Sequence, residues 1–290
     1  MVTSSFTIDP YHSNFGAVVR GVQLHEDSSD ALTESVKKAL AHYGFLVIPD
    51  QSLTPDSLQA VAAKIGEFGV EPYLEPMASC PHVVEVRRDA AETTPIFGSQ
   101  WHSDWSFQDS PPGATLLYGA EVPPIGGDTV FADAMRALEE LSPKMTQLLS
   151  DLQGVHTAAP SYGLKGLFAK DDSSRSMKIR VSAEAEKTQK HPLVRVHPET
   201  GRCSLYVNHV YTTAIDEFDP EESRALLTFL FRHMTQSAFK FRHRWEHGTL
   251  LIWDNRSVIH YADGGYEGYG RLMYRTTLKG ERPRPKASSS

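Results

Sequence analysis

Apolar side chains at helical spacing predict four helices along the chain. Residues 31–43 carry Leu32, Val36 and Leu40 on one face, and Gly44 follows where such a helix would stop. The same spacing of apolar positions predicts further helices over residues 54–65, 134–152 and 220–234. The helix at 54–65 begins with a Thr-Pro pair, which suits an N-cap followed by the first helical turn.

Short runs of β-branched and aromatic residues predict strands between these helices. They lie at residues 45–48, 83–86, 114–120, 249–253 and 271–278. The polar stretch 161–190 is expected to form a surface loop or lid, and the polar tail 283–290 is expected to be disordered. Short strands toward both ends of the chain, with helices inserted between them, predict an antiparallel β sandwich or barrel decorated by helices.

Composition narrows the class of protein. The 290 residues are 40% hydrophobic and 22% charged, which suits one large core, and we expect a single domain over residues 1–282. A formal net charge of −7 argues against binding to nucleic acid or to an anionic membrane. The two cysteines, Cys80 and Cys203, lie far apart and outside any CxxC pattern, so neither a disulfide framework nor a cysteine zinc site is expected. With no signal-peptide pattern and no membrane-length apolar run, we expect a cytoplasmic protein.

Candidate metal ligands begin with His102 and Asp104. In an extended strand, side chains two residues apart face the same side, so an imidazole and a carboxylate could reach one cation. A second histidine from a distant strand would complete the two-histidine, one-carboxylate set that leaves three positions open on Fe(II). The short motif is weak alone, because the segments starting at His25 and His197 have the same spacing.

His260 is the candidate for the third ligand. A predicted strand runs into a turn that delivers His260, and a glycine-rich loop follows. Arg271 and Arg275 then lie an even number of residues apart, which places both on one face of a strand. Two guanidiniums on the inner face of a barrel would need anions, whereas on the outer face they would be solvated surface charges.

These segments resemble a known family, the taurine dioxygenase and 2,4-dichlorophenoxyacetate dioxygenase family of Fe(II)/2-oxoglutarate-dependent dioxygenases. The likeness covers nearly the whole chain and is strongest at residues 101–104, 126–129, 197–201, 205–208 and 253–275. The resemblance implies a double-stranded β-helix, or jelly roll, with flanking helices. It also implies that the segment 197–199 is a turn motif and not a pair of metal ligands.

The resemblance also implies roles for single residues. His102, Asp104 and His260 match the family's three iron ligands. Thr129 and Arg271 match the pair that holds the distal carboxylate of the co-substrate 2-oxoglutarate.

Other positions bear on the prime substrate. Arg275 matches the arginine that binds its acidic group, and Tyr211 matches a tyrosine that binds the substrate carboxylate in phenoxypropionate-type members. Taurine-type members have a histidine and an asparagine where this chain has Glu71 and Gly98. A glutamate would repel a sulfonate, so taurine is disfavoured. Glu71 is therefore a candidate substrate-binding residue, with a solvated loop position as the alternative.

The expected function is hydroxylation of a small anionic organic molecule, with an aryloxyalkanoate-like carboxylate favoured. Fe(II), 2-oxoglutarate and O2 would take part, and succinate and CO2 would be released. Residues 206–211 and 275–278 look more like the phenoxypropionate-type members. Relatives often form dimers or tetramers, so the resemblance is compatible with a homo-oligomer. The alternatives are a taurine-type sulfonate or alkyl sulfate ester dioxygenase and, from another class, a non-catalytic jelly-roll protein that binds metal and keto acid.

Overall fold

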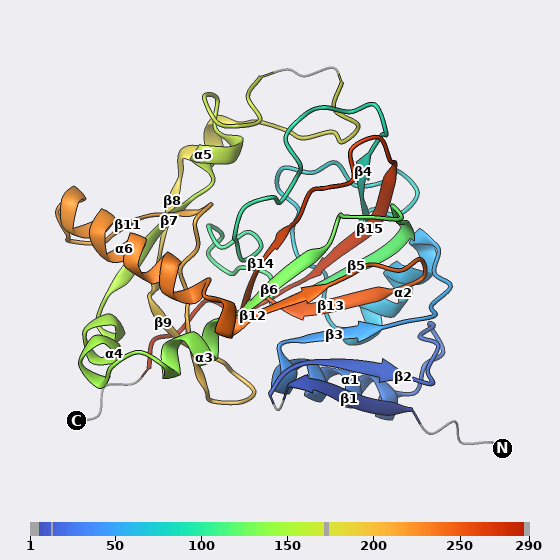
Figure 1. The fold of residues 1–290 in the computed structure, drawn as a ribbon, viewed down its shortest axis with the longest axis horizontal. Helices are drawn as coiled ribbons and strands as arrows, with labels where there is room; N and C mark the ends of the chain where they lie inside the picture. Colours follow the sequence, from blue (N-terminus) through green and yellow to red (C-terminus); the bar gives the residue numbers. More distant parts are fainter. Residues whose placement is uncertain (1–5, 13, 171–173, 287–290) are drawn as a thin grey trace.

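The computed structural model describes residues 6–12, 14–170 and 174–286. Its largest unit is a seven-stranded sheet of order β1-β2-β3-β13-β5-β15-β4 (Figure 1). All neighbouring strands in it are antiparallel except β2 and β3. The strands are β1 (Thr7–His12), β2 (Phe15–Arg20), β3 (Phe45–Ile48), β4 (Val84–Arg88), β5 (Ala114–Glu121), β13 (Leu250–Asp254) and β15 (Arg271–Leu278).

A three-stranded antiparallel sheet of order β12-β6-β14 packs on the large sheet. Phe131 from the small sheet stacks on Phe45 from the large one, with ring centroids 4.6 Å apart. Trp253 and Met273 bury their side chains in the same cluster. The two sheets therefore enclose one core between them. The strands of the small sheet are β6 (Thr129–Asp133), β12 (Lys240–His243) and β14 (Val258–Ala262).

Further strands and helices extend the small-sheet side of the molecule (Figure 1). Sheet β11-β7-β8 and the pair β10-β9 lie there. Their strands are β7 (Gln153–Thr157), β8 (Thr188–Pro192), β9 (Val194–Val196), β10 (Cys203–Leu205) and β11 (Thr212–Ile215). The helices on this side are α3 (Ala134–Glu139), α4 (Pro143–Ser150), α5 (Ala159–Tyr162) and α6 (Pro220–Met234), with short 3-10 turns η1 (Ala183–Glu186) and η2 (Ser237–Phe239).

Two helices cover the outer face of the large sheet. They are α1 (Asp30–Tyr43) and α2 (Pro55–Ile65), which bury Val36 and Leu58 against strand residues such as Ile252. Gly44 has φ +76° and ends α1 by donating its N–H to the carbonyl of Leu40, a left-handed cap that suits glycine. A reciprocal capping box between Thr54 and Ser57 starts α2.

The structure confirms a β-rich chain with flanking helices and corrects three expectations of detail. The predicted helix 134–152 is two helices, because Ser142 caps a new helix that begins at Pro143. The segment 161–190 is not only a loop, since it contains η1 and the start of β8. His102 lies in an isolated bridge and Asp104 begins a turn, so these two residues do not share a strand.

Three other expectations concern covalent links, membrane helices and the tail. Cys80 and Cys203 are both free. No helix in the described part of the chain is long and apolar enough to span a bilayer. Within the tail predicted to be disordered, the carbonyl of Arg284 accepts a hydrogen bond from Val196, and Pro285 bridges to Arg195. Residues 287–290 of that tail lie outside the described residues.

Candidate metal centre and adjoining cavities

Three buried side chains face one point between the two sheets. The ligand atoms of His102, Asp104 and His260 lie within 4.8 Å of one another, and no other His, Cys, Asp and Glu cluster in the described residues could hold a metal ion. Nε2 of His102 is 3.6 Å from Oδ1 of Asp104, and Nε2 of His260 is 3.9 Å from the same oxygen. This donor set is the facial triad that suits ferrous iron.

A backbone bridge brings the distant ligands together. The N–H of His102 donates to the carbonyl of His260 over 2.9 Å, and the N–H of His260 donates back over 2.8 Å. The chain then turns at Asp104, so its carboxylate reaches the same point although it is not on a shared strand. The backbone bridge and this turn therefore bring the three ligands together. The sequence pattern had instead predicted that His102 and Asp104 would meet through alternation along one strand.

The protonation states suit metal binding. Nδ1 of His102 lies 2.7 Å from the carbonyl of Gln100, which fixes Nδ1 as the donor and leaves Nε2 free to ligate. Burial, aided by the neighbouring His102, lowers the pKa of His260 to about 3, so His260 is neutral at pH 7. Burial opposes ionisation of Asp104, but Arg275 and the two imidazoles outweigh it and hold the pKa of this carboxyl well below its ordinary value.

Two buried polar residues hold Asp104 in place. The hydroxyl of Thr115 donates to Oδ2 of Asp104 over 2.6 Å. The amide of Asn255 donates to that hydroxyl over 2.9 Å, and its oxygen accepts from the N–H of Asp104 over 3.2 Å. The sequence reasoning missed both residues, because a threonine inside a strand carries no local signal of this contact.

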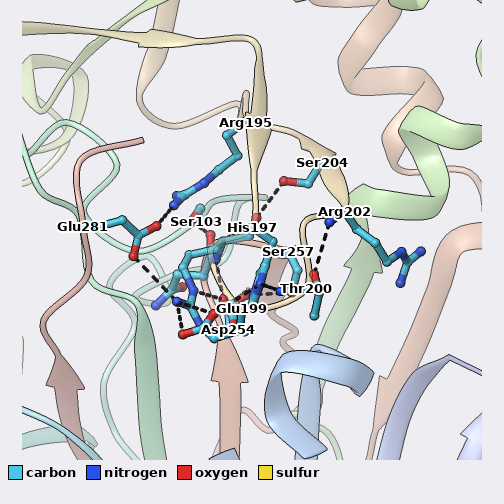
Figure 2. Close-up of polar contacts among 12 residues, drawn as sticks. Ser103, Arg195, His197, Glu199, Thr200, Arg202, Ser204, Asp254, Ser257 and Glu281 are labelled. Carbon is cyan, nitrogen blue, oxygen red and sulfur yellow. Dashed lines mark hydrogen bonds and ion pairs between the residues drawn. The ribbon is translucent and has the colours of Figure 1, made fainter. Parts of the chain in front are cut away.

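A charged network surrounds Asp254 at the end of β13 (Figure 2). Asp254 is fully buried, and its Oδ2 lies 3.0 Å from Nε2 of His197 and 2.6 Å from Nη2 of Arg256. Glu199 lies 3.2 Å from Nδ1 of His197 and also pairs with Arg256. Nε2 of His197 is thus engaged by Asp254, and its Nδ1 accepts from the N–H of Thr200 over 3.3 Å, so neither ring nitrogen is directed at the metal centre.

One cavity beside the three ligands is lined by Thr129 and Arg271. Arg271 is buried, and its one hydrogen bond runs from Nη2 to the carbonyl of Gly127 over 3.3 Å. Among the described residues its Nε has no partner, and no carboxylate pairs with it. Burial lowers the pKa of Arg271, which is the mark of a desolvated cation without a counter-charge. This cavity is therefore suited to an anion with a carboxylate.

A second cavity shares His102 and Asp104 with the first, and it is largely aromatic. Tyr211, a predicted substrate-binding residue, is buried in its wall. The other aromatic side chains in this wall are those of Phe97, Trp105, Tyr162 and Phe168. Sequence reasoning missed Tyr162 and Phe168, because the segment that carries them was expected to be a polar surface loop.

The structure also answers where Glu71 lies. Its side chain is buried, not solvated, and both carboxylate oxygens lie 2.6–2.7 Å from Nη1 of Arg275. Nη2 of Arg275 lies 3.0 Å from Oδ1 of Asp104. Arg271 and Arg275 thus share one face of β15, as predicted, and the structure shows that this face is the buried one. Arg271 has no carboxylate partner among the described residues, whereas Arg275 lies between two carboxylates.

Comparison with known proteins identifies the family. The chain matches the model of the taurine catabolism dioxygenase TauD, TfdA family over residues 7–277. The chain belongs to this family of dioxygenases. The resemblance inferred from the sequence motifs is thereby confirmed.

Two curated relatives of this TauD/TfdA member illustrate its range. The chain is 31% identical over 278 residues to an alpha-ketoglutarate-dependent sulfate ester dioxygenase of Pseudomonas putida, covering 95% of this chain and 90% of the relative. It is 32% identical over 271 residues to the alpha-ketoglutarate-dependent 2,4-dichlorophenoxyacetate dioxygenase of Cupriavidus pinatubonensis, covering 88% and 91%. The relatives differ in substrate, so the family alone does not decide the substrate of this chain.

Solved structures agree with this TauD/TfdA assignment. A putative alpha-ketoglutarate-dependent taurine dioxygenase from Burkholderia xenovorans superposes with a TM-score of 0.81 and 29% identity, covering 97% of this chain and 95% of that one. AAD-2 in complex with Mn(II) and N-oxalylglycine superposes with a TM-score of 0.75 and 27% identity, covering 96% and 99%. The sheets and helices described above are therefore shared along nearly the full length of these chains.

Proposed function

We propose that this TauD/TfdA member is an Fe(II)- and 2-oxoglutarate-dependent dioxygenase that hydroxylates a small organic molecule. The observation that carries the proposal is the buried His102, Asp104 and His260 group, which shares a cavity with the unpaired cation Arg271. When bound, Fe(II) with 2-oxoglutarate and O2 would supply the oxidation, releasing succinate and CO2. The two facing sheets would form the jelly roll that the sequence motifs imply.

The residues around the cavity have separable roles in this proposal. Arg271 and Thr129 would bind the distal carboxylate of 2-oxoglutarate, since a buried guanidinium gains most from a bidentate carboxylate partner. Thr115 and Asn255 would fix the orientation of Asp104. The aromatic wall around Tyr211 would hold the prime substrate and exclude water next to the metal centre.

A non-catalytic binding protein is the rival from another class. Loss of turnover during evolution removes the constraint on ligands and on the co-substrate site. Here the three ligands, Thr129 and Arg271 are all present and line one cavity. Their joint presence favours the enzyme.

The anionic substrate predicted from the sequence has mixed support. Its aromatic part agrees with a cavity walled by Phe97, Trp105, Tyr162, Phe168 and Tyr211. The prediction that the substrate carries an acidic group depended on Arg275 being free to bind an anion. The pairing of Arg275 with Glu71 argues against that availability.

Succinate release tests the proposed activity. The Fe(II)-loaded protein would be supplied with 2-oxoglutarate, O2 and, in turn, aryloxy acids, their neutral amides, sulfonates and alkyl sulfate esters. We expect at least one aromatic compound to stimulate succinate release and to be recovered in hydroxylated or cleaved form. A protein that binds both Fe(II) and 2-oxoglutarate but releases no succinate with any compound of the panel would support the non-catalytic rival.

A further inference from the structure

Glu71 and Arg275 form a buried ion pair beside the metal centre. Their side chains are 7% and 4% exposed, and they lie 204 residues apart in the sequence. Nη1 of Arg275 contacts both oxygens of Glu71, at 2.7 and 2.6 Å. The carboxylate therefore occupies the position in which an anionic ligand would meet this nitrogen of Arg275.

Trp105 holds the pair together. Its indole N–H donates to Oε2 of Glu71 over 2.8 Å, and its ring lies 5.2 Å from the guanidinium carbon of Arg275. The backbone of Trp105 has φ +44°, a left-handed conformation that is costly for a bulky side chain. A strained aromatic residue that contacts both partners indicates that the ion pair is a built feature of the cavity.

The charges of the site balance when Glu71 is included, and this count depends on the proposed function. Burial raises the pKa of Glu71, but the donors on Arg275 and Trp105 oppose this and favour the carboxylate. Asp104 and Glu71 then contribute two negative charges, and Arg271 and Arg275 contribute two positive ones. A ferrous ion and the dianion 2-oxoglutarate cancel each other. An anionic prime substrate would leave one uncompensated negative charge in a buried site, which is strongly unfavourable.

We propose that Glu71 is a built-in counter-ion of Arg275 that selects against acidic prime substrates, so that the substrate of this chain is neutral. The aromatic wall of the second cavity fits an apolar, ring-bearing body. Arg275 lines the first cavity, and its Nη2, although 3.0 Å from Oδ1 of Asp104, makes no hydrogen bond within the described residues. This N–H can therefore donate to a neutral acceptor oxygen such as a carbonyl, ether or hydroxyl. Glu71 is thus a specificity-determining residue.

Formate, a small anion, tests whether Glu71 acts as the counter-ion of Arg275, and it requires no assumption about the substrate's shape. Melting temperatures would be measured anaerobically, at constant ionic strength, for the Fe(II)- and 2-oxoglutarate-loaded wild type and Glu71→Ala with increasing formate. We expect formate to raise the melting temperature of Glu71→Ala saturably, by about 3 °C at tenfold its dissociation constant, and to leave the wild type unchanged. Glu67→Gln, which removes an exposed charge paired with Lys279, is the matched control and should behave as the wild type. Equal stabilisation of wild type and Glu71→Ala, or of neither, would overturn the proposal.

A matched pair of aromatic ligands tests the selectivity, using Glu71→Gln to keep the side chain's shape. Phenoxyacetate and phenoxyacetamide differ in charge but hardly in size, and their binding would be followed through the visible band of the anaerobic Fe(II)–2-oxoglutarate complex. The wild type should favour the amide. Glu71→Gln should shift the ratio of dissociation constants toward the carboxylate by about tenfold or more, because it restores one net positive charge. A wild type that prefers the carboxylate, with a ratio unchanged in Glu71→Gln, would contradict the proposal.

The two proposals fail in different ways. If the visible band never forms in the wild type, the proposed dioxygenase function fails. If the band forms and succinate is released, yet neither formate nor the ligand pair distinguishes Glu71 variants from the wild type, only the counter-ion proposal fails.

Discussion

At the scale of single residues, the hydroxyl of Thr115 has a specific task. It donates to Asp104 over 2.6 Å and accepts from Asn255, so it fixes the carboxylate of Asp104 relative to Asn255. We expect Thr115→Val, which keeps the side chain's shape, to weaken Fe(II) binding about 10- to 100-fold, as loss of a group that orients a metal ligand commonly does. Isothermal titration under anaerobic conditions would measure this.

Thr276 provides the matched control for that substitution. It is also a fully buried threonine of the large sheet, but its hydroxyl has no hydrogen-bond partner among the residues that the structure describes. Thr276→Val should leave Fe(II) affinity unchanged. If both variants bind Fe(II) as the wild type does, Thr115 has no role in orienting Asp104.

Arg271 allows a second prediction at this scale. Because it is buried and meets no carboxylate in the described residues, it should depend on 2-oxoglutarate for its counter-charge. Arg271→Gln should raise the dissociation constant of 2-oxoglutarate about 100-fold or more, since loss of a buried charge partner costs about 2–5 kcal/mol. Arg271→Lys keeps the charge but loses the planar fork, so an intermediate loss is expected. Unchanged affinity in Arg271→Gln would place the co-substrate elsewhere.

The site residues were predictable to different degrees for a physical reason. His102, Asp104 and His260 lie in segments whose pattern and family likeness mark them from the sequence. Glu71 was a candidate through its departure from taurine-type members, but its burial against Arg275 depends on a contact across 204 residues. No periodicity or spacing along the chain encodes such a contact.

At the scale of elements, buried charges stabilise the turn between β13 and β14. Asp254 is fully buried there between Arg256 and His197. Burial opposes its ionisation, but Arg256 and His197 hold the pKa of Asp254 below its ordinary value. Its stabilisation is therefore present above the ordinary carboxyl pKa and is lost as the pH falls below it.

Substitution of Asp254 should show how much these buried charges contribute to the free energy of unfolding. Asp254→Ala leaves Arg256 buried without its closest partner, and we expect the free energy of unfolding to fall by about 3–5 kcal/mol. Glu199→Ala, in the same network but half exposed, should cost no more than about 1 kcal/mol. Urea denaturation of both variants at pH 7 would measure the difference, and equal losses would contradict this view of the turn.

The elements themselves were predicted where local signals are strong. Helices α1, α2 and α6 and strands β3, β5 and β15 agree with apolar spacing and end signals such as Gly44. Strands such as β1, β8 and β12 were missed, because they are mostly polar or exposed and are stabilised by their neighbours in a sheet. Pairing, not propensity, determines such strands.

At the scale of the whole molecule, buried histidines make stability depend on pH. Burial lowers the pKa of His191 and of His243 to about 4 each. Between pH 6.5 and about 4, the unfolded chain binds protons that the folded chain does not. Folding stability should therefore fall across this interval as the pH decreases, by about 1.4 kcal/mol per pH unit for each such histidine.

His191→Gln tests that pH dependence. Nε2 of His191 donates to the carbonyl of Gln108 over 2.9 Å, a bond that a glutamine amide can replace. The variant should show a smaller decrease in unfolding free energy from pH 7 to pH 5 than the wild type, measured by chemical denaturation. An unchanged slope would show that His191 takes up no proton on unfolding in that range.

The architecture of the whole chain was predictable only as a class. Strands toward both ends of the sequence and inserted helices indicated a β-rich fold. The order of the large sheet, in which β3 pairs with β13 and β4 with β15, joins segments from opposite ends of the chain. A separate isolated bridge places His260, on β14 of the small sheet, beside His102. Such long-range pairings could be anticipated only through the family resemblance.

The central claim is that three residues hold Fe(II) while Arg271 meets 2-oxoglutarate beside it. Anaerobic addition of Fe(II) and 2-oxoglutarate should give a weak visible charge-transfer band in the wild type. The band should disappear in His102→Ala, and in Arg271→Gln it should require about 100-fold more 2-oxoglutarate. A wild type without the band, or a His102→Ala variant that keeps it at full strength, would contradict the account.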